Sequence, residues 1–284
     1  MSATPPLPST TIRPPDRWPG VGLAEAWDLR AICFVLVKRS VQIRYRQTII
    51  GAGWAIIQPL VLALIFTIFF GFLIRVPSDG IPYPLFVYTG MVVWQLVARI
   101  ATEGSVSVVA NVALLTKIYF PRVYFPVSVS IVSLVDLIFA LLALAVLLVW
   151  NAALPEFPAL VAAIIVFIPV LTIIAMAAAL GVALWLSALN VAYRDVEQLL
   201  PLLVQLWFFL SPVIYPSSLV PSEFLWLYWL NPIALSIEGF RWAIVAGPAP
   251  PPEQWIIGTG VAVLLLVTGY LFFRSRETGF VDVI

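Results

Sequence analysis

The sequence has 284 residues, of which 62% are hydrophobic and 10% charged; its net charge is +1, and it contains no histidine and one cysteine. A soluble domain carries about 25% charged residues, so the composition excludes a water-soluble globular protein and predicts an all-α polytopic membrane protein. The near-neutral charge gives no indication of a nucleic-acid partner. With no histidine and a single cysteine, disulfide frameworks, most zinc sites and Cys/His nucleophile pairs are excluded, and we predict neither a metal site nor a catalytic residue.

The N-terminal region is predicted to contain a tail and an interfacial helix. Residues 1–22 are rich in Pro, Ser and Thr and predict a disordered tail, followed by a single membrane domain over residues 23–284. The first apolar run, Leu29–Val37, is far shorter than the ~20 residues that cross a membrane. We therefore predict an amphipathic helix in the membrane interface rather than the flank of the first span. Four basic residues of this helix are expected to face anionic headgroups: Lys38, Arg39, Arg44 and Arg46.

Six transmembrane helices are predicted from the apolar runs that follow. Their expected ranges are residues 54–74, 84–110, 127–150, 159–189, 196–212 and 255–273. The fourth run exceeds the ~30 Å hydrocarbon core at about 1.5 Å per residue. It is therefore expected to tilt or to extend into water.

Three ionisable residues lie within the predicted spans: Arg99 and Glu103 in the second, and Asp136 in the third. Arg99 and Glu103 are four residues apart and so share a helix face. Charges at this depth are expected to face the helix bundle rather than lipid. A network that holds helices together is favoured over a proton relay, which would indicate a secondary transporter.

The basic residues indicate the orientation of the chain. With both termini cytoplasmic, twelve of the fifteen Lys and Arg residues lie inside, Arg75 and Arg241 lie outside, and Arg99 is intramembrane. A seventh full span near residues 222–246 would place the basic C-terminal tail outside. It would also bury Glu238 and Arg241 at a cost of several kcal/mol.

The segment 213–247, between the last two spans, is instead predicted to be re-entrant. It is apolar but interrupted by prolines, and irregular backbone at membrane depth is tolerated only where it is buried in protein or lines a cavity. Two half-helices, about 222–230 and 233–246, are expected on either side of Asn231–Pro232. Glu238 and Arg241 are three residues apart and are expected to pair on the second half-helix.

Several motifs together resemble the permease subunit of ABC-2 type polysaccharide exporters, which move O-antigen, capsule or teichoic-acid chains. The resemblance covers residues 23–284. Its motifs are LLTKIYFPR (114–122), SLVD (133–136), LNVAYRDVEQLLP (189–201), LSPVIYP (210–216), NPIALSIEGFRWAI (231–244) and GFVDVI (279–284).

The resemblance implies a homodimer in the cytoplasmic (inner) membrane with two copies of a separate ABC ATPase. It also implies an interfacial N-terminal helix, cytoplasmic coupling segments and short gate helices before the last span. The sequence has no Walker-type GxxxxGK[ST] motif, so the ATPase chain would bind ATP and Mg²⁺, and no cofactor is expected on this chain.

Two cytoplasmic segments are candidates for coupling to an ATPase. In the first, aromatic residues would fill a groove of the ATPase and basic residues would fix the register; the alternative is an ordinary positive-inside loop. In the second, a structural anchor is an equally good interpretation. The candidate residues are Leu115, Lys117, Tyr119, Phe120 and Arg122 in the first segment, and Tyr193, Arg194 and Asp195 in the second.

A polysaccharide path needs flat apolar surfaces for the C–H faces of sugars, with sparse hydrogen-bonding groups. The candidate channel residues are Tyr88, Trp94 and Gln95 on the second span and Trp207, Phe208 and Tyr215 on or after the fifth. The candidate gate residues are Pro212, Asn231, Pro232, Glu238 and Arg241.

We expect a transport subunit that exports a lipid-linked or other long glycan with membrane lipids around it. An ABC-2 exporter of lipids or drugs is the first alternative, because the same architecture serves both. A membrane-embedded glycosyl- or acyltransferase is the second, and the lack of histidine and of paired carboxylates in one loop argues against it.

Overall fold

A computed structural model of the chain describes residues 30–46, 53–115, 120–151, 163–193, 195–277 and 279–280, and the regular structure in these ranges is helical. The all-α prediction is therefore confirmed. The predicted tail, the start of the interfacial helix and the last four residues lie outside the described residues. Among the described residues, five helices are long and apolar enough to cross a membrane: Gly53–Leu73, Tyr83–Val106, Tyr124–Trp150, Ile165–Ala192 and Pro252–Glu277.

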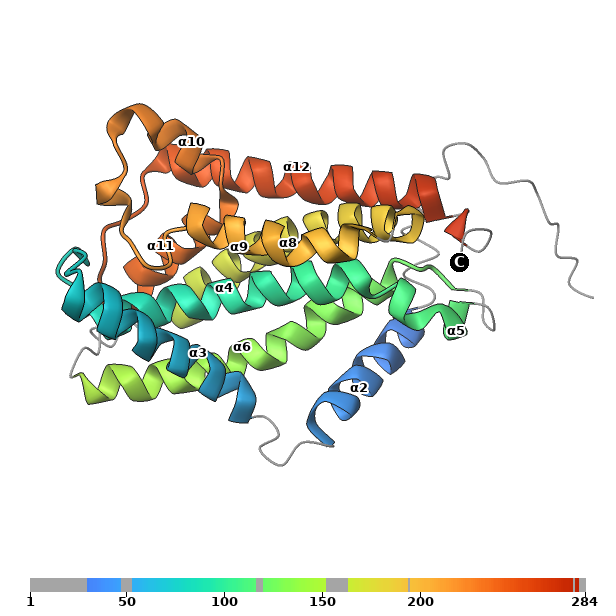
Figure 1. Cartoon of the computed structure of the whole chain (residues 1–284), viewed down its shortest axis with the longest axis horizontal. Coiled ribbons are helices and arrows are strands. Elements are labelled where there is room, and N and C mark those ends of the chain that lie inside the picture. The colour runs from blue at the N-terminus through green and yellow to red at the C-terminus, as the bar shows by residue number, and fades with distance from the viewer. Residues whose placement is uncertain are drawn as a thin grey trace, which may run out of the picture.

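The long helices run side by side along the long axis of the molecule (Figure 1). They are α3 (Gly53–Phe66) with η1 (Thr67–Leu73), α4 (Tyr83–Val106), α6 (Tyr124–Trp150), η3 (Ala163–Phe167) with α8 (Ile168–Ala192), α9 (Asp195–Leu210) and α12 (Pro252–Glu277). The short helices α10 (Leu225–Trp229) and α11 (Pro232–Val245) lie toward one end of this bundle, and α5 (Val112–Leu115) lies at the other.

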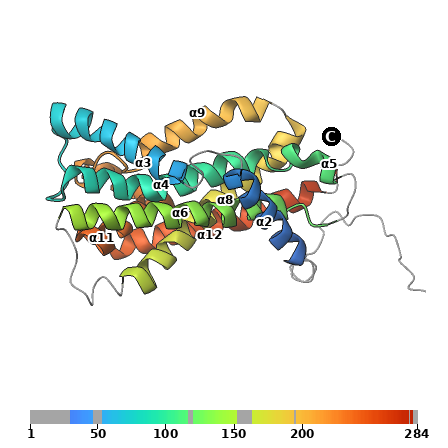
Figure 2. The same cartoon turned by 90° about the horizontal axis from the view of Figure 1, so that it is seen from below.

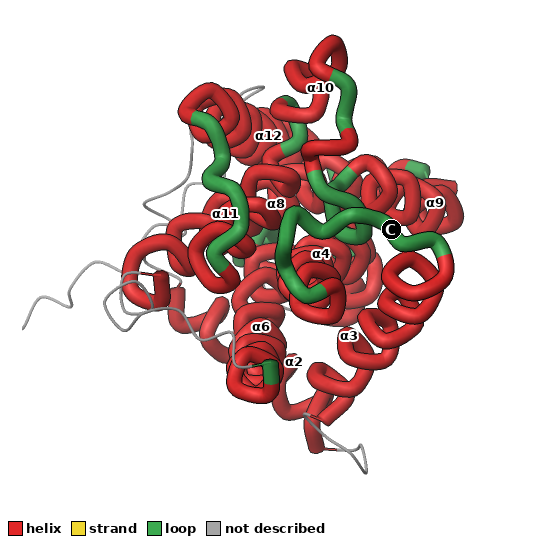
Figure 3. Tube along the Cα trace, turned by 90° about the vertical axis from the view of Figure 1, so that its left-hand side faces the viewer, coloured by secondary structure: helices red, strands yellow, loops and turns green. Residues whose placement is uncertain are grey.

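Helix α4 forms the centre of the bundle, as the end-on view shows (Figure 3). In its most apolar stretch 78% of the residues are buried, whereas the other four candidate spans have 17–39% buried. The remaining helices surround α4 and expose apolar side chains outward, such as Phe72, Val146 and Ile256. A helix apolar on its outer face is suited to a bilayer rather than to water.

A close backbone contact joins α8 and α12. A Cβ atom at Gly269 would lie 2.3 Å from the carbonyl oxygen of Gly181, and a Cβ atom at Gly181 would lie 2.4 Å from the carbonyl carbon of Leu265. Small residues allow helices to approach this closely in membranes. One turn away, the indole of Trp185 donates to Thr268 Oγ1 at 3.2 Å, which adds a polar contact to the same seam.

The helix ends differ from several predicted ranges. The fifth predicted span, 196–212, corresponds to α9, whose 16 residues extend about 24 Å, less than the ~30 Å core. Helix α12 extends beyond the predicted range 255–273 at both ends. Pro252 is compatible with its first turn, and Arg274 and Arg276 are favourable in its last turn. The start of the fourth predicted span, at residue 159, lies outside the described residues.

Helix α2 (Arg30–Arg46) lies across the bundle at an angle to the long helices (Figure 2). Cys33 and Leu36 face the bundle and are buried, whereas Phe34, Val35 and Ile43 are exposed. Burial raises the pKa of the Cys33 thiol, which is consistent with a packing residue rather than a nucleophile.

Candidate functional site

Four charged side chains from three helices form one network. Arg44 of α2 donates from Nη1 to Asp136 Oδ2 of α6 at 2.9 Å and from Nη2 to Glu103 Oε1 of α4 at 2.5 Å. Arg99 of α4 pairs with Asp136 and, with 3.5 Å between Nε and Oε1, with Glu103. The predicted contact between Arg99 and Glu103 is thus confirmed, and the network ties α2 to the bundle.

Sequence reasoning missed Arg44 as a member of this network. The prediction that it faces lipid headgroups is wrong, because its guanidinium lies between two carboxylates from other helices. The charge balance could have indicated it, because the network predicted from the sequence contains two carboxylates, Glu103 and Asp136, but only one arginine. Arginine does not deprotonate in proteins, so two arginines among the carboxylates favour a structural network over a proton relay.

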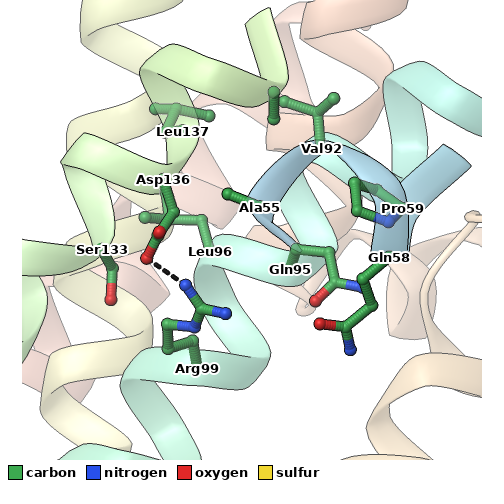
Figure 4. A pocket seen from close by; sticks show the side chains of 11 residues that line it. Ala55, Gln58, Pro59, Val92, Gln95, Leu96, Arg99, Ser133, Asp136 and Leu137 are labelled. Carbon is green, nitrogen blue, oxygen red and sulfur yellow. Dashed lines mark hydrogen bonds and ion pairs between the residues drawn. The ribbon is translucent and has the colours of Figure 1, made fainter. Parts of the chain in front are cut away.

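A small cavity adjoins the network (Figure 4). Its volume of about 20 Å³ fits one water molecule. Polar side chains on its wall are Gln58 of α3, Gln95 and Arg99 of α4, and Ser133 and Asp136 of α6. In Figure 4 the amides of Gln58 and Gln95 approach each other on one side, and the Arg99–Asp136 pair closes another. A candidate channel residue, Gln95, therefore also borders the charge network.

The first candidate coupling segment is described only in part. Lys117 and Tyr119 lie outside the described residues, and so does the side chain of Leu115. Phe120 is 5% exposed and packs on Phe125 with 5.3 Å between ring centres. The expectation that Phe120 fills a groove of another protein is therefore wrong, since its ring is buried within this chain. Arg122 is half-buried, and its guanidinium carbon lies 5.9 Å from the centre of the Phe280 ring.

The second candidate coupling segment is exposed where it is described. Tyr193 is 66% exposed at the end of α8, and Asp195 is the exposed first residue of α9. A carboxylate in the first turn of a helix is favourable for the helix dipole, which supports an anchoring role for Asp195. Arg194 lies outside the described residues.

The candidate channel residues separate into buried and accessible groups. Tyr88 is fully buried, and its hydroxyl donates to the carbonyl of Ala140 at 3.2 Å. The prediction that Tyr88 lines a path is therefore wrong. Tyr88 lies on the side of α4 that packs against α6. Helical periodicity alone does not show which helix packs against that side.

The other aromatic candidates meet between α4 and α9. Trp94 contacts Trp207 and Phe208 edge-on, with ring centres 6.3 Å and 5.3 Å apart. Beside them, an open cleft of about 260 Å³ lies between α3, α4 and α9. Its lining residues are Leu62, Phe66, Met91, Trp94, Gln95, Pro201, Val204, Gln205 and Phe208. Phe66 and Phe208 are partly buried, so this cleft presents aromatic rings beside two amides, whereas Trp207 lies outside its lining.

Asn231 joins elements at the end of the bundle that carries α10 and α11. Its Oδ1 atom accepts hydrogen bonds from the Ile233 amide at 3.1 Å and the Trp207 indole at 3.2 Å, and its Nδ2 donates to Ser211 Oγ at 2.9 Å. One side chain thus caps α11 and joins it to the end of α9. Pro232 occupies the first turn of α11, where its missing N–H costs least.

Glu238 and Arg241 do not form the predicted pair. Arg241 is 3% exposed and donates from Nε to the Phe86 carbonyl at 3.1 Å and from Nη2 to the Val213 carbonyl at 2.8 Å. Glu238 accepts instead from the Tyr228 hydroxyl at 2.9 Å and from Gln254 Nε2 at 2.7 Å. Their spacing placed the two side chains near each other but did not show that other elements supply closer partners.

These contacts fix α11 from several sides. Arg241 joins it to α4 and to the turn after α9, which contains the buried Pro212; Glu238 joins it to α10 and α12. Tyr215, after the break, is partly buried and donates to the Phe209 carbonyl at 3.0 Å.

Within the described ranges, no group of three or more His, Cys, Asp or Glu residues could hold a metal ion. The polar groups around α11 bind one another and backbone carbonyls, and those of the network bind one another. The arrangement can hold helices and present aromatic surfaces.

Comparisons with known proteins agree with the motif resemblance. The family model "ABC-2 type transporter" matches residues 32–245. The chain is 28% identical to the "O-antigen export system permease protein RfbA" of Myxococcus xanthus, over 91% of this chain and 97% of that protein. It is 29% identical to an RfbA of Klebsiella pneumoniae over 84% of this chain and 86% of that protein. It is 25% identical to the "Polysialic acid transport protein KpsM" of Escherichia coli, over 85% and 92% respectively.

Proposed function

The chain belongs to the ABC-2 type transporter family, and from this premise we propose that it is the permease subunit of an ATP-driven exporter that moves a polysaccharide across the cytoplasmic membrane. The observation that carries the proposal is the set of relatives. Those named for O-antigen export and for polysialic acid transport align with this chain over at least 86% of their own length. Their names favour a glycan over a lipid or a drug as cargo.

In this proposal the energy comes from a second protein. Two copies of this chain assemble with two copies of an ABC ATPase, which holds ATP and Mg²⁺. The ATPase docks at the end of the bundle that carries α5, Arg122 and the exposed start of α9. Short exposed helical elements at this end are suited to transmitting movement into the bundle.

The proposed topology has six crossings and cytoplasmic termini, with α9 as the fifth crossing. At 16 residues, α9 is short, so local thinning of the bilayer or its position against a second copy would accommodate it. The segment from Ser211 to Gly247 re-enters the membrane from outside. Support comes from α11, whose charged side chains Glu238 and Arg241 are buried and bound within the protein, as membrane depth requires.

The proposed path follows the aromatic cleft between α3, α4 and α9. The rings of Phe66 and Phe208 offer flat surfaces to sugar C–H faces, and Gln95 and Gln205 offer sparse hydrogen bonds. A second copy facing this cleft would close the path on its open side. Weak repeated contacts of this kind suit a sliding polymer, because tight binding would stall it.

The test is reconstitution. The chain is co-expressed with a candidate ABC ATPase, the complex is placed in vesicles, and movement of a lipid-linked glycan across the bilayer is measured. We expect export that requires ATP and stops when the P-loop lysine of the ATPase is replaced. A chain that acts alone as a transferase, or a stable complex that moves a lipid or drug but no glycan, would contradict the proposal.

A further inference from the structure

Two distant parts of the chain meet at the end of the bundle that carries α5. The backbone amide of Arg122, in the turn before α6, donates to Glu277 Oε1 in the last turn of α12 at 2.6 Å. The second oxygen, Oε2, accepts from Arg274 Nη1 at 2.6 Å. The Glu277 side chain is 10% exposed, so its carboxylate is buried with both oxygens bound.

An apolar cluster lies beside this contact. Phe280 is 3% exposed and meets Phe273 edge-on with ring centres 5.3 Å apart. The same cluster contains buried side chains from the 120–123 turn and from three helices besides α12: Phe120 and Val123 of the turn, Tyr124 and Phe125 of α6, Cys33 and Leu36 of α2, and Leu184, Ala188 and Val191 of α8. Four helices and the 120–123 turn therefore share one core at this end.

Helix α6 has no side-chain cap of its own. Its N-cap residue, Val123, accepts no hydrogen bond through its side chain, and the first turn holds no acidic residue. The amide groups at a helix start need partners, and a negative charge there is favourable. Glu277 of α12, 155 residues away along the chain, accepts from the amide of Arg122, one residue before the N-cap, and so places a carboxylate beside the start of α6.

We propose that Glu277 is a positioning residue: its carboxylate clamps the 120–123 turn to the end of α12 and so holds the coupling segment in register. The clamp itself follows from the contacts, whereas its role in coupling rests on the proposed function. Residues 120–123 lead directly into α6, which carries Asp136 of the charge network. Movement applied to the clamped turn is thereby passed to α6 and α12 together.

The chain contains its own reporter for the clamp. Cys33 is the single cysteine and is buried in the same cluster as Phe120 and Phe280. In the full-length wild-type protein in membranes, Cys33 should react slowly with a permeant maleimide. Glu277→Ala should raise that rate about tenfold, as expected for the loss of a charge-assisted hydrogen bond. Glu277→Gln keeps an oxygen acceptor for the Arg122 amide and should remain near the wild-type rate.

Two further variants keep the test decisive. Glu253→Ala removes an exposed carboxylate from the opposite end of the same helix and should leave the rate unchanged. Glu277→Asp withdraws the acceptor by one methylene and should raise the rate even if Glu277→Ala does not accumulate. Unchanged Cys33 labelling in both Glu277→Ala and Glu277→Asp would overturn the clamp.

The coupling role has a separate readout. In the complex with the ATPase, Glu277→Ala should bind the ATPase and hydrolyse ATP normally, yet export several-fold less glycan per ATP, and Glu277→Gln should restore the ratio. An unchanged ratio in Glu277→Ala would overturn the positioning role. If the wild-type complex exports no glycan, the proposed function fails, while the Cys33 result still decides whether the clamp exists.

Discussion

The guanidinium carbon of Arg241 lies 3.4 Å from the centre of the Phe86 ring. The same guanidinium donates to two backbone carbonyls on different segments. A single buried cation therefore joins α11 to the start of the central helix α4. The neighbouring Gly90 leaves room for it, because a Cβ atom there would lie 2.9 Å from Arg241 Nη2.

Arg241→Lys is expected to destabilise the protein. An ammonium group cannot reach both carbonyls and lie over the ring as the planar guanidinium does. The loss of one hydrogen bond to a charged donor should lower the free energy of unfolding by about 2 kcal/mol, measured by denaturation in detergent. Arg75→Lys, at an exposed arginine of the same outer end, is the matched control. Equal stability of the two variants would show that Arg241 acts only as a charge.

The network predicts energetic coupling between α2 and α4. A double-mutant cycle with Arg44→Gln and Glu103→Gln should give a coupling energy of about 1 kcal/mol, since Glu103 is 45% exposed and solvent weakens the pair. Unfolding in detergent provides the measurement. The same cycle with Lys38→Gln, an exposed residue of α2, should give a value near zero. A zero value for Arg44 as well would mean that this pair does not hold α2.

The glycine seam predicts a cost for one methyl group. In Gly181→Ala the new Cβ atom meets backbone of Leu265 at 2.4 Å, so α8 and α12 must separate, at a cost of roughly 1–3 kcal/mol. Thermal unfolding in nanodiscs would show a lower midpoint. Gly260→Ala, in α12 with nothing within 4 Å of its Cβ, should be neutral or slightly stabilising. Similar midpoints for both variants would rule out a close seam.

The proposed topology predicts opposite labelling at the two ends of the bundle. In a Cys33→Ser background, Ser222→Cys should react with a membrane-impermeant maleimide on intact cells, because this exposed residue precedes α10. Ser275→Cys, exposed near the end of α12, should react only after permeabilisation. The reverse pattern would invert the assigned orientation and remove the support for a cytoplasmic coupling segment.

Local rules predicted the elements well. Apolar runs located the long helices, and the Asn231–Pro232 break coincides with the start of α11, because an N-cap followed by proline is a local signal. Re-entry of this segment into the membrane stays a prediction. The i,i+4 spacing of Arg99 and Glu103 likewise predicted a contact that the structure contains.

Contacts between distant segments were not predictable in the same way. Arg44 and Asp136 are 92 residues apart, so no periodicity relates them, and composition placed Arg44 with other surface cations. Glu238 and Arg241 satisfied the local rule for a pair, yet Gln254 and the Phe86 carbonyl lie in better positions. The neighbour of Tyr88 was not predictable either, because only tertiary packing determines that this side of α4 contacts α6.

The glycine seam also constrains how the protein is made. Gly181 and Gly269 meet through their backbones, but α9, α10 and α11 lie between them along the chain. During synthesis α8 is therefore made before α12, and the backbone at Gly181 lacks its partner until α12 follows. This part of the bundle closes late, when α12 packs back onto α8.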